Sequence, residues 1–87
     1  MLFYMVGKTD ISTLKKNILG HVDREHEPKV KIFAEVIVVG KPWLVSIFEA
    51  DKKEDIVDYI RPHLKDAEFD IYPAIDIKKA YDIYKKV

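Results

Sequence analysis

The feature that most constrains this chain is a segment in which both faces of each predicted strand are apolar. Residues 29–51 (KVKIFAEVIVVGKPWLVSIFEAD) predict two strands joined by a turn at Gly40, Lys41 and Pro42. A strand with one face in water should alternate apolar and polar side chains. Strict alternation instead gives the first strand one face with Val30, Ile32, Ala34, Val36 and Val38 and another with Phe33, Ile37 and Val39, interrupted by Lys31 and Glu35. The second strand has Val45 and Ile47 on one face and Leu44 and Phe48 on the other.

Regular apolar spacing on both sides of this segment predicts the remaining elements. Residues 2–6 are a short apolar run and predict a strand. Leu14, Ile18 and Val22 recur at helical spacing, which predicts a helix that begins at residue 11 and ends near residue 25.

The C-terminal half predicts a second helix, a fourth strand and a last helix. Asp51 followed by Glu54 is typical of a helix start, and Pro62 should break or bend the end of that helix. Its expected buried stripe is Ile56, Ile60 and Leu64. Residues 67–75 predict the fourth strand, and Asp76 should cap the last helix. That helix carries on one side Ile77, Ala80, Tyr81 and Tyr84.

The order of these elements is βαββαβ followed by a helix, which predicts a single α+β domain over residues 1–87. This order is typical of the ferredoxin-like sandwich, in which two helices cover one face of a four-stranded antiparallel sheet. The other face would be bare in a monomer, yet here it would carry aliphatic side chains. We therefore expect a homodimer in which the two sheet faces pack together.

Composition excludes several classes of partner and site. Fifteen basic and fifteen acidic residues cancel, so we expect neither nucleic acid nor an anionic membrane as a partner. The chain has no cysteine, which excludes disulfides and cysteine zinc sites. The apolar start is only six residues long, too short for a signal peptide or a membrane span, and we expect a cytoplasmic protein. The absence of Gln fits a thermophile and an AT-rich genome equally well.

Three stretches resemble the dimeric α+β-barrel superfamily, whose ferredoxin-like subunits face each other through their sheets. They are the opening MLFYMVG, the strand PWLVSIFEAD that leads into a helix, and the fourth strand AEFDIYPAI. Within the superfamily, the chain is similar to a small bacterial and archaeal domain family of unknown function. Relatives in the superfamily include cofactor-free monooxygenases and isomerases, but none of their catalytic motifs maps onto this chain.

The candidate catalytic residues are His21 and Glu49. His21 flanks the apolar stripe of the first helix and could carry protons. Glu49 ends the second inner strand and could be a general base if it is buried. A shared site requires both side chains to face one cavity between helix and sheet. The alternative is that His21 has no fixed role and that Glu49 is a solvated strand end.

The candidate ligand-binding residues are an aromatic set and one serine. Tyr4, Trp43 and Tyr72 could line a pocket for an aromatic ligand, although packing is the commoner role of such side chains. Ser46 interrupts an apolar strand and could bind a ligand or a neighbouring backbone group.

No metal or other cofactor is expected. The segment HVDREHE at residues 21–27 invites a metal interpretation. However, His21 and His26 lie about 140° apart on a helix and cannot share one ion there.

Two functions remain open at this stage. One is a dimeric ligand-binding or interaction module without catalysis. The other is a cofactor-independent enzyme that acts on a small apolar or aromatic substrate between sheet and helices. A cavity with at least two converging polar groups would favour an enzyme, and a filled cleft would favour a bare interaction module.

Overall fold

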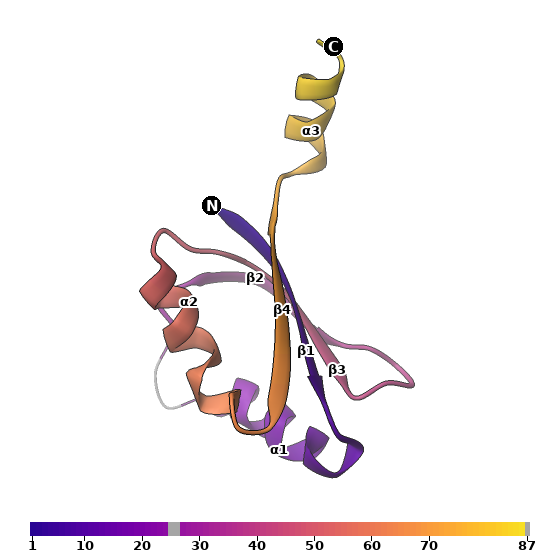
Figure 1. Ribbon diagram of the computed structural model, residues 1–87, viewed down its shortest axis with the longest axis vertical. Coiled ribbons are helices and arrows are strands. Elements are labelled where there is room, and N and C mark those ends of the chain that lie inside the picture. Colours follow the sequence, from indigo (N-terminus) through magenta and orange to yellow (C-terminus); the bar gives the residue numbers. More distant parts are fainter. Residues whose placement is uncertain (25–26, 87) are drawn as a thin grey trace.

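In the computed structural model, which describes residues 1–24 and 27–86, the chain forms one four-stranded antiparallel sheet with helices (Figure 1). The elements in order are β1 (Leu2–Thr9), α1 (Ile11–Val22), β2 (Lys31–Ile37), β3 (Trp43–Glu49), α2 (Lys53–Ile60), the short 3₁₀ helix η1 (Arg61–His63), β4 (Ala67–Ala74) and α3 (Ile77–Tyr84). The predicted α+β class, the four antiparallel strands and the C-terminal helix are therefore confirmed.

The strands lie in the order β2-β3-β1-β4, so β1 and β3 are the inner pair. The helix α1 connects β1 to β2, with β3 between these two strands, and α2 connects β3 to β4, with β1 between them. Both helices place side chains on the same side of the sheet, because His21 of α1 and Tyr59 of α2 bond the same residue of β2. We call this side, which carries Met5, Ser46 and Phe48, the covered face, and the opposite side the open face.

A bulge in β2 decides which of its side chains reach the covered face. The pairing with β3 shifts between Ile32 and Ala34, so that Phe33 is the extra residue. Before the bulge Ile32 lies opposite Phe48, and after it Glu35 lies opposite Ser46. The strict alternation expected from the sequence is therefore wrong for this strand, because a bulge exchanges the faces of all the residues that follow.

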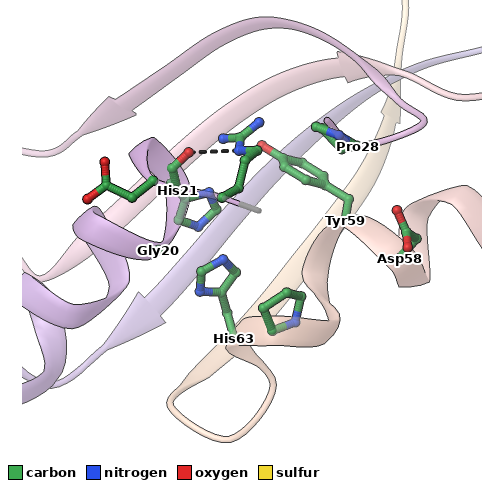
Figure 2. A pocket seen from close by; sticks show the side chains of 9 residues that line it. Gly20, His21, Pro28, Asp58, Tyr59 and His63 are labelled. Carbon is green, nitrogen blue, oxygen red and sulfur yellow. Dashed lines mark hydrogen bonds between the residues drawn. The ribbon is translucent and has the colours of Figure 1, made fainter. Parts of the chain in front are cut away.

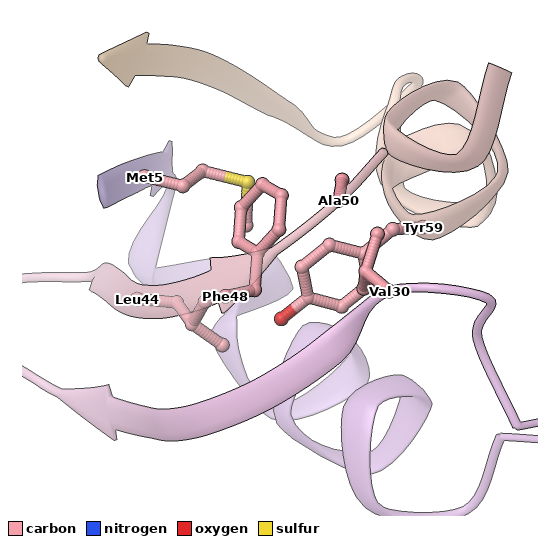
Figure 3. Close-up of a cluster of buried hydrophobic side chains, with 6 residues drawn as sticks. All are labelled: Met5, Val30, Leu44, Phe48, Ala50 and Tyr59. Atoms are coloured by element: carbon pink, nitrogen blue, oxygen red, sulfur yellow. The ribbon is translucent and has the colours of Figure 1, made fainter. Parts of the chain in front are cut away.

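The apolar core lies between the covered face and α2 (Figure 3). Its buried members are Met5, Val30, Leu44, Phe48, Ala50 and Tyr59. The ring of Phe48 lies 5.6 Å from that of Phe3 and 5.1 Å from that of Tyr59, measured between centroids. Phe48 therefore joins the inner strands to α2.

The helix α1 buries polar side chains most deeply. Asn17 and His21 are its buried residues, whereas Leu14 and Ile18 of the predicted stripe are half-buried and Val22 is 75% exposed. The helix ends at Val22, earlier than expected, and the predicted end at residue 25 lies outside the described residues. Apolar spacing therefore predicted the helix but not its buried face.

The other helix ends follow the local sequence in part. Asp51 does not cap α2, whose N-cap is Lys52 without a side-chain bond. The helix gives way to η1 at Pro62, as predicted, and Leu64 beyond it is exposed. The Asp76 carboxylate accepts a 2.8 Å hydrogen bond from the backbone N–H of Lys78, which confirms the predicted cap of α3.

The helix α3 stands off the end of β4, away from the other elements (Figure 1). None of its eight residues is buried. The molecule accordingly measures 48 × 29 × 17 Å. Within the described part of the chain, no helix has the length and apolar character needed to cross a membrane.

Replacement of Phe48 by alanine should lower the free energy of unfolding by about 3–5 kcal/mol, because its fully buried ring leaves a cavity in a small core. The matched control is Val39→Ala in the β2–β3 turn, where the side chain is 99% exposed and the change should stay within about 0.5 kcal/mol. Urea unfolding at fixed protein concentration measures both. Similar losses in the two variants would contradict the packing described here.

Candidate functional site

The structure separates the two residues predicted to be catalytic. His21 is buried on the covered face, where its ring lies between α1, β2 and α2. Glu49 follows Phe48 in β3 and points to the open face, where it is exposed opposite Leu2 and Lys31. The two side chains do not share a cavity, so the condition for a joint His21–Glu49 site is not met.

The predicted ligand-binding residues are divided in the same way. Tyr4 and Tyr72 stack on the open face with ring centroids 6.4 Å apart. Trp43 also lies on the open face, below the ammonium groups of Lys8 and Lys41. Ser46 alone of this set is on the covered face, where it is fully buried. These residues therefore do not line one pocket.

Glu35 is the centre of a hydrogen-bonded cluster on the covered face. Its Oε2 atom accepts from Nδ1 of His21 at 2.9 Å and from the Tyr59 hydroxyl at 2.6 Å. Its Oε1 atom accepts from the Arg24 guanidinium at 2.6 Å. The Ser46 hydroxyl lies 2.8 Å from the Tyr59 hydroxyl and extends the cluster into the sheet. One carboxylate thus links β2 to α1, to the segment after α1 and to α2.

The cluster fixes the charge of Glu35 and the proton of Tyr59. Burial opposes ionisation of Glu35, but hydrogen bonds from His21, Tyr59 and Arg24, with the charge of Arg24, outweigh it and lower its pKa to about 2. Burial and the bond to Glu35 raise the pKa of Tyr59. At neutral pH, therefore, Glu35 is a carboxylate that accepts hydrogen bonds and Tyr59 is a neutral phenol that donates one.

A second imidazole lies parallel to His21. The ring of His63 stacks on that of His21 with 4.0 Å between centroids and 3° between planes. Its Nδ1 atom lies 3.2 Å from Oδ1 of Asn17, whose amide nitrogen donates to Thr9 and to the backbone of Thr13. A glycine at position 20 permits this stack, because a Cβ atom there would lie 2.9 Å from Cε1 of His63.

His63 is held neutral. Burial, helped by the charges of His21 and Arg24, lowers the pKa of His63 to about 4 against the weaker opposing effect of Glu35 and Asp66. Since the Asn17 carbonyl can only accept, the proton of the neutral ring is on Nδ1 and the lone pair is on Nε2.

A cavity of about 370 Å³ opens beside these rings (Figure 2). Figure 2 places the His21 and His63 rings side by side, with Tyr59 and Pro28 farther along the wall. Its lining residues are Gly20, His21, Asp23, Arg24, Pro28, Asp58, Tyr59, Pro62 and His63. The cavity therefore combines flat ring surfaces with two imidazoles and a guanidinium, all of them on the covered face.

Sequence reasoning missed most of this cluster. Glu35 looked like an interruption of an apolar face, and Tyr59 lies beside the predicted stripe of α2 rather than on it. A carboxylate within a largely apolar strand was the one available signal, because a buried charge requires partners.

The arrangement does not assemble a metal site among the residues described. No three His, Cys, Asp or Glu side chains come together there as ligands. Glu25 and His26 of the HVDREHE segment lie outside the described residues.

No known protein family profile matches this chain, and no curated protein matches it either.

The chemistry that the site could perform therefore has to be inferred from its own side chains. An ionised carboxylate orients one imidazole, a second imidazole is neutral, and both border a cavity of ligand size.

Acidification should destabilise the protein in two steps. The folded pKa of His63, about 4, lies below its ordinary 6.5, so the unfolded chain binds the proton more readily and stability is lost as the pH falls from 6.5 to 4. The loss should reach roughly 3 kcal/mol. Glu35, whose folded pKa is about 2 against 4.5, adds a second loss between pH 4.5 and 2.

Thermal unfolding measured at a series of pH values checks the first step. The variant His63→Gln cannot titrate there and should have a flatter profile between pH 6.5 and 4.5, whatever its stability at pH 7. Identical slopes for the variant and the natural protein would contradict the neutral, buried state of His63.

Replacement of Glu35 by glutamine should lower the free energy of unfolding by about 2–4 kcal/mol, because an amide cannot accept from all three donors. The matched control is Asp66→Asn. The Asp66 carboxylate is as little exposed as that of Glu35, but its partner Lys16 is 73% exposed, and we expect a loss below about 1 kcal/mol. Denaturant unfolding compares the two variants. Equal losses would mean that Glu35 does not hold the cluster together.

Proposed function

We propose that this protein is a homodimeric ligand-binding module of the ferredoxin-like, dimeric α+β-barrel type, in which the open faces of two subunits pack together. The topology supports the fold assignment. In each of the two βαβ units an antiparallel strand separates the strands that the helix connects, which is the split βαβ arrangement.

The observation that carries the proposal is the excess surface of the single subunit. Its accessible surface is 6725 Å², whereas a compact monomer of 10.2 kDa exposes about 5,300 Å². The excess of about 1,400 Å² is larger than the roughly 800 Å² that each partner of a standard interface buries. The radius of gyration, 14.4 Å, likewise exceeds the value of about 12 Å expected for this length.

Apolar rows on the open face support a sheet-to-sheet contact. One row crosses three strands through Val36, Val45 and Val6, and the next runs through Ala34, Ile47, Tyr4 and Tyr72. Ile47, Val36 and Tyr72 are exposed in the subunit. An apolar patch of this extent on a small protein marks an interaction surface.

The exposed apolar stripe of α3 also supports association with a partner. Its stripe of Ile77, Tyr81 and Tyr84 is 64–81% exposed. An eight-residue helix is marginal in water unless its apolar side is packed. Docking on the second subunit would cover this stripe.

A second copy of the chain is the occupant that fits the open face best. The apolar rows are flanked by side chains of both signs, Lys8 and Glu68 toward one end and Lys31 and Glu49 toward the other. A two-fold axis can therefore place opposite charges against each other. The formal net charge of the chain is zero, so two copies do not repel.

Sedimentation of the natural protein should give twice the chain mass of 10.2 kDa. The variant Ile47→Asp should dissociate or weaken the dimer strongly, because it buries an unpaired charge in the centre of the interface. Val39→Asp makes the same chemical change in the β2–β3 turn and should leave the dimer intact. A natural protein that stays monomeric at high concentration, or equal effects of the two variants, would overturn the proposal.

A cofactor-independent enzyme is the second candidate function. It is favoured by two observations. The cavity is not filled and the imidazoles of His21 and His63 both line it. The Glu35 carboxylate also orients His21 there, as a catalytic base is oriented. Turnover of a small ring substrate that is lost in His21→Gln would favour the enzyme. Saturable binding without turnover would favour the binding module.

A further inference from the structure

The cavity beside the stacked imidazoles has a hydrogen-bonding pattern that selects its ligand. The Nδ1 atom of each ring is committed as a donor, that of His21 to the Glu35 carboxylate and that of His63 to the Asn17 carbonyl. In the neutral ring of His63, the Nε2 atom is therefore an acceptor.

The Nε2 atom of His63 is available to a ligand. Among the residues that the structure describes, this atom has no hydrogen-bond partner, yet no buried side-chain nitrogen or oxygen in this part of the chain lacks one. The Nε2 atom of His63 is therefore accessible, and its ring lines the cavity beside that of His21. A ligand that donates a hydrogen bond would satisfy an acceptor that otherwise binds water.

Charge and shape narrow the ligand further. The Arg24 guanidinium is paired with Glu35, while Asp23 and Asp58 also line the cavity. An anion would meet these two carboxylates and is disfavoured. The flat faces of Tyr59, Pro28 and Pro62 suit a planar ring, and a volume of about 370 Å³ is at the small end of ligand sites.

We infer that this cavity binds a small, neutral, planar ring compound that carries a hydroxyl or ring N–H group, which it donates to Nε2 of His63. The inference rests on the proposed binding role and names its ligand class. It does not require the dimer, because the cavity is on the covered face and the proposed interface is on the open face.

Phenol is the probe, with anisole as the matched ring that lacks a donor and benzoate as the matched anion. The full chain, labelled with ¹⁵N-histidine, is titrated with each compound and followed by NMR. Phenol should bind saturably and shift the Nε2 resonance of His63. Its affinity should exceed those of anisole and benzoate by about fivefold or more, the value of one added hydrogen bond.

Other outcomes would overturn the inference. Equal binding of phenol and anisole would show that the cavity is merely apolar. Tighter binding of benzoate would show that it is an anion site. The absence of a saturable shift with phenol would show that it binds no such ring. The preference for phenol should also be lost in His63→Gln, and its retention there would contradict the assignment of His63 as the acceptor.

The same titration of Ile47→Asp separates this inference from the proposed dimer. A monomeric variant that still binds phenol supports the cavity independently of assembly. A natural protein that is dimeric but does not bind phenol removes the cavity inference and leaves the dimer standing.

Discussion

The ionised carboxylate of Glu35 is the interaction on which the covered side of this protein depends. It accepts hydrogen bonds from His21, Arg24 and Tyr59, which lie in or beside the two helices that cover the sheet. In the described helices, Tyr59 is the one buried hydrophobic residue. Removal of a partner from such a group leaves a buried charge uncompensated. Hydrogen bonds of fixed geometry therefore hold the two helices on the sheet together with the apolar packing.

The sequence predicts the features of this structure that depend on residues close together in the chain, and it does not predict those that depend on pairing between distant segments. Helical spacing and strand propensity are local, and they predicted the order of the elements and the cap at Asp76. The bulge at Phe33 is not local, since it depends on how β2 pairs with β3, and without it Glu35 would point to the open face. The cluster of Glu35, His21 and Tyr59 therefore could not be assembled from spacing alone, and Glu49 was chosen in place of Glu35.

The two faces of the sheet differ in what accompanies their apolar side chains. The covered face packs Met5, Leu44 and Phe48 against Tyr59 of α2 and also holds the Glu35 carboxylate and the Ser46 hydroxyl. The open face carries rows of valine, isoleucine and tyrosine, several of them exposed. The subunit is consequently held together by apolar packing and by polar bonds of fixed geometry. The apolar rows of the open face are available for association, in which hydrophobic burial is the main favourable term.

The projection of α3 has a thermodynamic consequence for assembly. In the proposed dimer, Ile77, Tyr81 and Tyr84 leave water only when two chains meet, so formation of this helix is coupled to association rather than to folding of the subunit. Burial of apolar surface lowers the heat capacity. Dilution should therefore raise the heat capacity and decrease the helix content together, and the C-terminal segment would act as a built-in reporter of the monomer–dimer equilibrium.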